Sequence, residues 1–87
     1  MSIRNKYNSK GNYINGKKDG YWEEYWCNGK LQLKGNYING KRDGYWEYYY
    51  DNGNLWGKGH FINDNPDGYF EWCNFDGTLK GMNFYVN

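Results

Sequence analysis

The chain contains the stretch Gly11-Asn12-Tyr13-Ile14-Asn15-Gly16-Lys17-Lys18-Asp19-Gly20-Tyr21-Trp22-Glu23, and close copies of it begin at Gly35 and at Gly59. The other half of the unit also repeats, as Asn28-Gly29-Lys30-Leu31, Asn52-Gly53-Asn54-Leu55 and Asp76-Gly77-Thr78-Leu79. The period is 24 residues throughout. Self-similarity at a fixed period of about 20–50 residues is the signature of a repeat architecture, in which each unit is one supersecondary element.

The repeat also predicts the domain organisation. About three and a half units cover Lys6–Asn87, with bounds 6–19, 20–43, 44–67 and 68–87. We expect these residues to form a single domain, because no linker or change of composition separates the units. Residues 1–5 precede the first unit, and we expect them to be a short disordered leader.

Composition favours strands over helices. Of the 87 residues, 20 are aromatic, 13 are Gly and 14 are Asn, whereas Ala is absent. Ala leads the helix-propensity scale and Gly and Asn lie near its bottom, so most helical folds are excluded. A net charge of +1 argues against nucleic-acid partners. The sequence has no apolar run of the length that a membrane span or a secretory signal needs, so a membrane partner is not expected.

Each unit is predicted to form two strands. The segment Tyr21–Cys27 is rich in aromatic residues, as strands are, and the return strand is Lys30–Ile38. Asn28-Gly29 between them predicts a two-residue type I′ turn. A second connection, Asn39-Gly40-Lys41-Arg42, leads to the next unit. The predicted fold is therefore all-β, a single-layer antiparallel meander of about seven strands built from β-hairpin repeats.

The predicted register places two different rows of residues on the two faces of the sheet. A two-residue turn pairs Cys27 with Lys30, and hence Trp22 with Gly35. If every unit presents the same faces, Gly35 also pairs with Trp46. One row is then Gly11, Trp22, Gly35, Trp46, Gly59, Phe70 and Asn83, flanked by a second row of Tyr13, Gly20, Tyr37, Gly44, Phe61, Gly68 and Tyr85. The opposite face carries Lys10, Glu23, Lys34, Glu47, Lys58 and Glu71, with alternating charge.

The face of alternating aromatic and glycine residues, here called the aromatic/Gly face, is the candidate binding surface. Its predicted contact residues are Trp22, Tyr37, Trp46, Tyr48, Phe61, Phe70 and Trp72. A single-layer sheet has no second layer to bury such a face. Three explanations remain open: strong curvature packs the face on itself, a partner covers it, or it stays open as a groove.

The unit resembles MORN repeats, and more closely the bacterial MORN-variant repeats. The resemblance rests on Asn-Gly-x-Leu after an aromatic strand and on Asn-Gly-Lys-x-Asp-Gly before Tyr-Trp, and it covers about 82 residues. The third unit departs from the pattern at Asp64-Asn65, at Pro66 and at Asn83. The resemblance implies a non-catalytic module for protein or membrane association, and some similar bacterial proteins are labelled antitoxin-like. A looser similarity exists to choline-binding and glucan-binding wall repeats.

Residues that carry catalytic or metal chemistry are few and have simpler roles. Glu23, Glu47 and Glu71 are expected to form a ladder with lysines rather than an acid–base pair, and His60 is expected to be a surface cross-strand residue. Asp64 and Asp67 are interpreted as turn residues rather than as a calcium loop. We therefore predict no enzyme, no catalytic residue, no metal and no cofactor.

Three functions remain from the sequence. The first is a protein–protein interaction module, such as an antitoxin or immunity-type partner, acting through the aromatic/Gly face on another protein or on a second copy. The second is binding of a carbohydrate or a choline-type ligand on stacked aromatic rings, and the third is a structural, self-assembling repeat. Cys27 and Cys73 lie on strands four apart, beyond disulfide reach, so free thiols and a cytoplasmic location are expected.

Overall fold

A computed structural model of the chain describes residues 9–86, so the predicted leader at residues 1–5 lies outside the described residues. Every element in the described part is a strand. The bounds are β1 (Ser9–Ile14), β2 (Lys17–Tyr25), β3 (Leu31–Ile38), β4 (Lys41–Tyr49), β5 (Leu55–Ile62), β6 (Asn65–Cys73) and β7 (Leu79–Tyr85).

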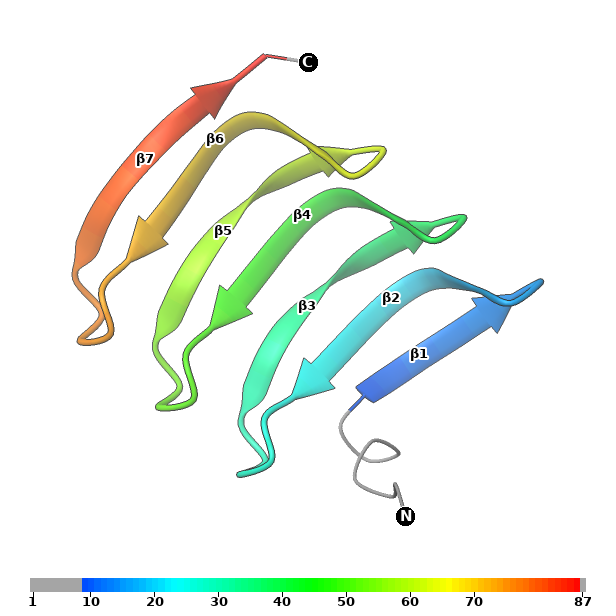
Figure 1. Cartoon of the computed structure of the whole chain (residues 1–87), viewed down its shortest axis with the longest axis horizontal. Coiled ribbons are helices and arrows are strands. Elements are labelled where there is room, and N and C mark those ends of the chain that lie inside the picture. The colour runs from blue at the N-terminus through cyan, green and yellow to red at the C-terminus, as the bar shows by residue number, and fades with distance from the viewer. Residues whose placement is uncertain (1–8, 87) are drawn as a thin grey trace.

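The strands form one antiparallel sheet in the order β1-β2-β3-β4-β5-β6-β7, which confirms the predicted meander. Figure 1 shows them side by side in a single curved layer, with β1 and β7 at the two edges and tight turns along both ends. Each consecutive pair is a hairpin, because the period of 24 residues holds two strands and two turns. The layer therefore presents two faces and two free edges.

The type I′ turns lie at the connections such as Asn39-Gly40, and not at those such as Asn28-Gly29, where they were predicted. Asn39 and Gly40 both have positive φ, 54° and 83°, and Ile38 pairs with Lys41, which defines a two-residue turn. At Asn28-Gly29 only Gly29 has positive φ, and Trp26 donates its N–H to the carbonyl of Lys30. This connection is a three-residue loop whose last residue is left-handed, so the predicted pairing of Cys27 with Lys30 is wrong.

A β-bulge restores the predicted register beyond this loop. Tyr25 pairs with Leu31, but Glu24 pairs with Leu33, so one residue of β3 is left over. The extra residue compensates for the longer loop. Trp22 therefore pairs with Gly35, and both faces are as predicted in the middle of the strands.

A larger irregularity bends the other half of each repeat. Between Lys34 and Asn36 the register shifts by two residues, and Tyr37 pairs with Arg42 rather than with Gly44. The predicted pairing of tyrosines with glycines is therefore correct between β2 and β3, where Gly20 pairs with Tyr37, and wrong between β3 and β4. Because this shift is even, the residues on both sides of it keep their predicted faces.

The hydrophobic core lies on the aromatic/Gly face itself. Trp22, Trp46 and Phe61 are 3%, 1% and 6% exposed. The indole of Trp46 lies over Gly35 on the preceding strand, where an added Cβ would come within 2.1 Å of the ring. Its Nε1–H donates to the carbonyl of Asn36 at 3.1 Å. Curvature and bare glycines therefore let one layer bury its own large rings.

Candidate functional site

The structure divides the seven predicted contact residues into two groups. Trp22, Trp46 and Phe61 are buried by neighbours in the same chain. The other predicted contacts are half-buried, namely Tyr37, Tyr48, Phe70 and Trp72. The first group forms the floor of the aromatic/Gly face, and the second group supplies rings that a binding molecule can reach.

An aromatic cluster centres on Tyr48 of β4. Its ring stacks on Trp46 with centroids 6.0 Å apart and meets Trp56 edge-on at 5.7 Å. Phe70 completes the cluster at 6.4 Å from Tyr48. Edge-to-face and offset arrangements at these distances are the favoured geometries for aromatic pairs. The cluster therefore holds the half-buried rings in fixed orientations.

Trp56 is a surface aromatic that the sequence reasoning missed. It lies where the register shifts between β4 and β5, since Tyr48 pairs with Gly57 and Tyr49 with Leu55. Strict alternation would place it on the charged face with Lys58, but the bulge, which the sequence did not predict, turns it to the aromatic/Gly face. A signal did exist: the position one period earlier is Gln32, so the indole is a departure from the repeat.

A groove of about 330 Å³ opens beside this cluster. Its lining residues are Trp26, Gln32, Leu33, Tyr48, Tyr49, Tyr50 and Trp56. Trp26 is held in place by its Nε1–H, which donates to the carbonyl of Tyr49 at 3.1 Å. Apolar walls with a few polar groups are the usual composition of a binding site, so this groove is a candidate binding site.

A cation lies over the rings of the first repeat. The ammonium of Lys18 is 4.8 Å from the Trp22 ring and 5.2 Å from the Tyr37 ring, and it forms a 3.0 Å ion pair with Glu24. Burial is the largest single influence and lowers the pKa of Lys18, but the hydrogen bond to Glu24 and the electrostatic interactions with Tyr37, Glu24 and Tyr13 together outweigh it, so the pKa is raised. The cation is therefore fixed on the aromatic/Gly face.

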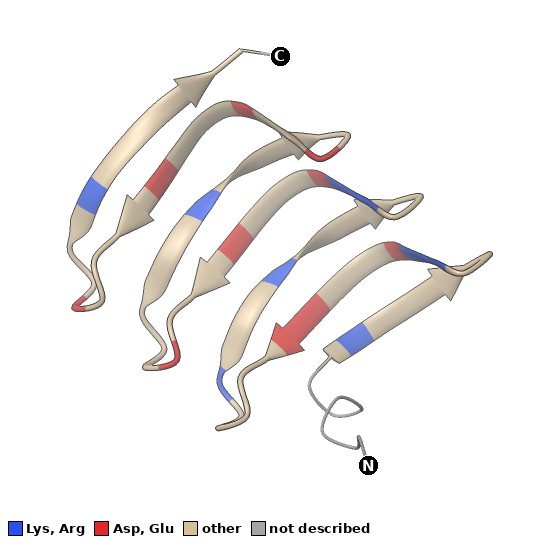
Figure 2. Ribbon diagram, in the orientation of Figure 1, with Lys and Arg blue, Asp and Glu red and all other residues tan. Residues whose placement is uncertain are grey.

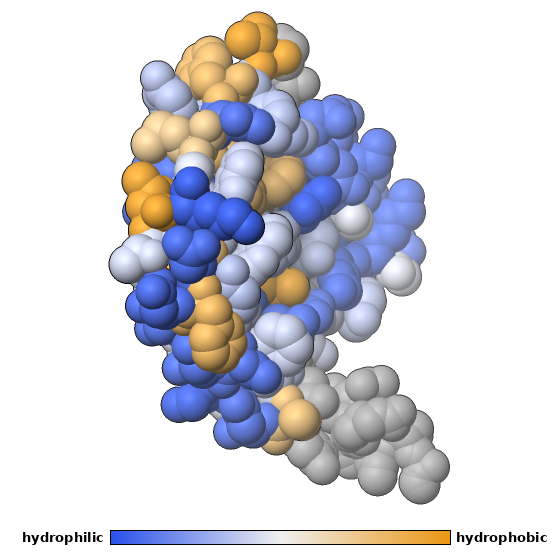
Figure 3. Space-filling model, turned by 60° about the vertical axis from the view of Figure 1, so that its left-hand side comes forward, coloured by the Kyte–Doolittle hydropathy of each residue, from blue (hydrophilic) through white to orange (hydrophobic). Residues whose placement is uncertain are grey.

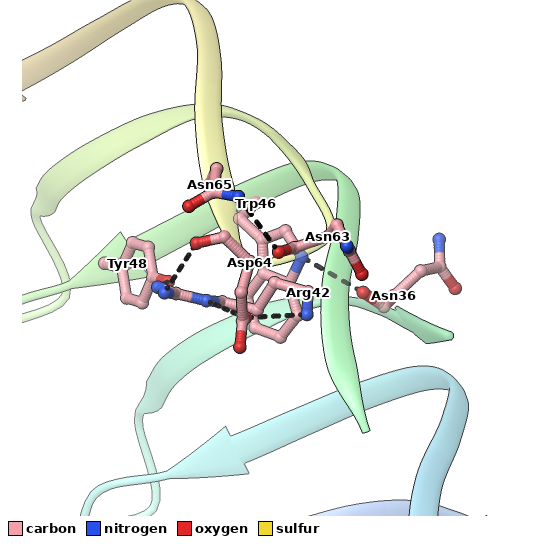
Figure 4. Close-up of polar contacts among 7 residues, drawn as sticks. All are labelled: Asn36, Arg42, Trp46, Tyr48, Asn63, Asp64 and Asn65. Atoms are coloured by element: carbon pink, nitrogen blue, oxygen red, sulfur yellow. Dashed lines mark hydrogen bonds and ion pairs between the residues drawn. The ribbon is translucent and has the colours of Figure 1, made fainter. Parts of the chain in front are cut away.

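Arg42 plays the same part in the second repeat, one period later (Figure 4). Its guanidinium lies 4.2 Å from the Phe61 ring and donates to the Tyr48 hydroxyl at 2.9 Å. Both Nε and the backbone N–H of Arg42 donate to Asp64 at 2.9 Å. Asp64 has φ of 73°, in a turn position that is Gly16 and Gly40 in the other repeats. This charged contact offsets the strain of a non-glycine residue there.

The polarity of the aromatic/Gly face changes along the array. Equivalent pairs of positions hold Lys18 and Glu24 on β2, Arg42 and Tyr48 on β4, and Pro66 and Trp72 on β6. A second, polar hollow of about 350 Å³ lies at the charged end, lined by Ser9, Tyr13, Lys18, Trp22, Glu24, Tyr25 and Gln32. Gln32 borders both hollows, so a polar site and an apolar groove adjoin each other.

The opposite face carries the predicted charge row in the predicted register. Glu47 pairs with Lys34 on one side and with Lys58 on the other, and Figure 2 shows acidic and basic residues alternating across the strands. Lys34 and Glu47 approach within 3.3 Å. The Glu47 carboxylate also accepts hydrogen bonds from Tyr45 and Tyr49 of its own strand. Tyrosine hydroxyls, in addition to lysines, thus hold this carboxylate.

Those hydrogen bonds shift the titration of both partners. Burial acts to raise the pKa of Glu47, but the bonds from Tyr49 and Tyr45 hold it below its usual value. Burial and the bond to Glu47 together raise the pKa of Tyr45 to about 12. Glu23 has a lowered pKa from Tyr25 and Tyr21 in the same way. Glu23 and Glu47 therefore stay ionised at neutral pH, and their oxygens already accept hydrogen bonds from tyrosine hydroxyls.

An exposed aliphatic residue recurs at the start of each type I′ turn. Ile14, Ile38 and Ile62 occupy the same position one period apart, and all three are exposed. The sequence reasoning did not single them out, although their spacing was visible. Figure 3 shows apolar side chains at the surface as separate spots among hydrophilic ones rather than as one continuous patch.

Both cysteines in the described chain are free thiols, Cys27 exposed and Cys73 buried, as predicted. Within residues 9–86, no group of three His, Cys, Asp or Glu side chains gathers in a way that would hold a metal ion. In the same residues there is no helix that is long and apolar enough to cross a membrane.

Comparison with known proteins adds no assignment. No family model matches the chain, and no curated protein matches it. The resemblance to MORN-variant repeats therefore rests on the motifs quoted above and stays a prediction.

Proposed function

We propose that the chain is a non-catalytic module that binds a protein partner through the aromatic/Gly face. The observation that carries this proposal is the open groove between Trp26, Tyr48 and Trp56, next to fixed rings on a rigid floor. Interface hot spots are enriched in Trp, Tyr and Arg and lie in well-packed pockets. The groove offers such a pocket for an apolar side chain of a partner.

The buried rings support this role by fixing the surface in advance. Trp46 cannot itself touch a partner, since it is 1% exposed, but it stacks on Tyr48 and so orients that ring. Arg42 fixes the other end of Tyr48 through its hydroxyl. A preorganised surface loses little conformational freedom on binding, which favours affinity.

The state of the carboxylates supports a role without catalysis. Glu23 and Glu47 have lowered pKa values, because tyrosine hydroxyls and lysines stabilise their charged form. A general acid or base needs a pKa near the operating pH and a free position beside its substrate. These two groups meet neither requirement, and their contacts are those of a structural ladder.

The proposal includes the repeat type and the compartment. The resemblance to MORN-variant repeats, whose similar members are association modules, supports a protein partner of the antitoxin or immunity kind. The free thiols of Cys27 and Cys73 support a reducing, cytoplasmic location.

A carbohydrate or choline-type ligand is the second candidate, and the size of the groove favours it. A volume of about 330 Å³ lies at the lower end of small-molecule sites, which span about 300–1,000 Å³. Aromatic walls suit the apolar face of a sugar ring or a quaternary ammonium group.

A matched pair of variants tests the proposal. Trp56 on the aromatic/Gly face and Tyr45 on the charged face are both 42% exposed, so Trp56→Ala and Tyr45→Ala remove similar exposed rings. Partners captured from the native host by the wild type are purified, and their affinity for each variant is measured by calorimetry. We expect Trp56→Ala to weaken binding by at least about 30-fold, the effect of one hot spot, and Tyr45→Ala by less than about threefold.

Two results separate the candidates. A partner whose affinity is unchanged by Trp56→Ala, while the variant keeps its circular dichroism spectrum, would refute the proposed surface. Quenching of Trp fluorescence by monosaccharides or choline, lost in Trp56→Ala and not in Tyr45→Ala, would instead support the small-ligand candidate.

A further inference from the structure

The C-terminal edge strand of the described sheet exposes more large apolar side chains than any other strand. β7 and the residues next to it carry exposed Leu79, Met82, Phe84, Tyr85 and Val86. The strand from Leu79 to Tyr85 holds one charged residue, Lys80. In the described sheet β7 pairs only with β6, so its outer edge has unpaired backbone groups. Proteins usually protect such an edge with charges, prolines or bulges. On β7 the lysine and the bulge both lie near the start of the strand, so residues 81–85 have none of these features.

The residues of β7 do not favour pairing with a further strand of the same repeat pattern. Gly11, Gly35 and Gly59 each lie under an aromatic ring from the next strand, and the equivalent position on β7 is Asn83. An indole placed over Asn83 as Trp46 is placed over Gly35 would collide with its Cβ, because the gap over Gly35 is only 2.1 Å. A different strand pairing is needed at this edge.

Self-pairing of β7 about a two-fold axis gives the residues from Gly81 to Tyr85 suitable partners on the second copy. With Asn83 opposite Asn83 of the second copy, Tyr85 lies opposite Gly81 and Met82 opposite Phe84, while Lys80 faces Val86. From Gly81 to Tyr85 the odd residues are on the aromatic/Gly face and the even ones on the charged face, so both faces continue into the second copy there. Two Asn carboxamides at the axis can donate to and accept from each other. An aromatic ring opposite a bare glycine is the pairing that the chain uses at Trp22 and Trp46.

Gly81 has the space that this arrangement needs. A Cβ added there would be 3.8 Å from the nearest atom of the Trp72 ring, an ordinary van der Waals contact, so that ring does not fill the space over Gly81. Two neighbouring registers of the same parity, centred on Met82 and on Phe84, place Asn83 opposite Gly81 and opposite Tyr85, respectively. Both lose the contact between the Tyr85 ring and Gly81.

We propose that the protein forms a two-fold symmetric dimer through antiparallel pairing of β7 with β7 of a second copy, centred on Asn83. The exposed apolar side chains of both copies offer roughly 800 Å² for burial, at about 200 Å² per aromatic and 100 Å² per aliphatic residue when fully buried. Stable interfaces bury about 1,200–2,000 Å² in total, so with the paired backbone this is a small interface. We therefore expect a weak, concentration-dependent dimer.

Sedimentation of the full-length protein over a range of about 1 µM to 500 µM tests the dimer. We expect a monomer–dimer equilibrium that Gly81→Thr and Phe84→Lys each weaken at least tenfold. Ile38→Lys is the matched control. Ile38 and Phe84 are 59% and 60% exposed, and Ile38 lies on β3, which is paired on both sides and is not an edge strand. A monomer over the whole range, or a dimer that both edge variants leave intact, overturns the proposal.

Cross-linking fixes the register and does not depend on those variants. In a Cys27→Ser background, Asn83→Cys places two thiols across the axis, where Cα atoms of opposed residues lie about 4.5–5.5 Å apart and a disulfide fits. Asn12→Cys places the same change on β1 at the other edge. We expect Asn83→Cys to form a disulfide dimer at least tenfold faster under mild oxidation. Equal rates, or faster cross-linking of Asn12→Cys, overturn the proposal.

Discussion

The Gly35→Ala substitution adds one methyl group at the most crowded point of the aromatic/Gly face, and we expect a loss of about 3–5 kcal/mol in the free energy of unfolding. The new Cβ would lie 2.1 Å from Cδ2 and 2.3 Å from Cε2 of Trp46. That ring is enclosed and its Nε1–H is bonded to the carbonyl of Asn36 at 3.1 Å, so a small displacement cannot relieve the clash.

The expected loss in the free energy of unfolding follows from the burial and the hydrogen bond that the displaced Trp46 ring loses. A large aromatic side chain buries about 150–250 Å², worth about 4–6 kcal/mol at 25 cal/mol per Å² as an upper estimate, and its hydrogen bond adds about 1 kcal/mol. Partial reburial in a new position recovers part of this. Domains of this size have about 5–15 kcal/mol of total stability, so Gly35→Ala should leave a marginal fold.

Urea unfolding followed by Trp fluorescence and circular dichroism measures the effect, with Gly81→Ala as the control. The Cβ at Gly81 meets Trp72 at 3.8 Å, so that substitution should change stability by less than about 1 kcal/mol. In a Trp46→Ala background Gly35→Ala should cost almost nothing, because the clashing ring is gone. A Gly35→Ala loss no larger than that of Gly81→Ala, or a loss that persists without Trp46, would refute the reasoning.

Three further predictions concern charges and thiols. Glu47→Gln should destabilise the domain by about 1 kcal/mol and leave partner binding unchanged, and ultraviolet titration should find the pKa of Tyr45 moved from about 12 toward 10. The folded-state pKa values of Glu23 and Glu47 are lowered from 4.5, so their contribution to stability is present above about pH 4.5 and is lost as the pH falls further. The folded-state pKa of Tyr45 is raised, so its contribution to stability is present below about pH 10 and is lost toward pH 12. The urea midpoint should therefore be highest between these limits. Cys27 should react with a thiol reagent at least tenfold faster than Cys73, and equal rates would contradict their different burial.

The strands and their faces could be predicted because the repeat supplies three aligned copies of one pattern. The pairing of Trp22 with Gly35 is correct although the loop from which it was counted is one residue longer than predicted, because the bulge in β3 compensates for the extra residue. The same alignment predicted the charge row and the free thiols. These features depend only on which residues are opposite each other in the middle of the strands.

The turn types could not be predicted, because the dipeptide Asn-Gly fits both connections. Asn39-Gly40 adopts the type I′ turn, and Asn28-Gly29 ends a three-residue loop instead. The difference depends on the bulge that leaves an extra residue in β3 and on the bend near Gly44, whose φ is 91°. Both are properties of the whole curved sheet and are not encoded in one dipeptide.

The groove was missed for the same reason. Strict alternation would put Trp56 on the charged face with Lys58. A bulge that the sequence did not predict turns it to the aromatic/Gly face, where it meets Tyr48 beside the groove. The burial of Trp46 to 1% was also beyond the sequence pattern, since it depends on the curvature of a single layer. The alignment of Trp56 with Gln32 was the one available signal.

The two proposed surfaces are compatible because they lie on different parts of the sheet. The groove lies over β3 to β5, whereas the dimer uses the outer edge of β7. Pairing about an axis normal to the sheet keeps odd residues opposite odd residues, so both aromatic/Gly faces point to the same side. With strands about 4.8 Å apart, the two grooves would be on the order of 35–40 Å from each other. A partner that presents two sites at this spacing gains avidity from the dimer without any new contact in the groove. Loss of the β7 pairing would then weaken binding to a bivalent partner and leave the affinity for a monovalent one unchanged.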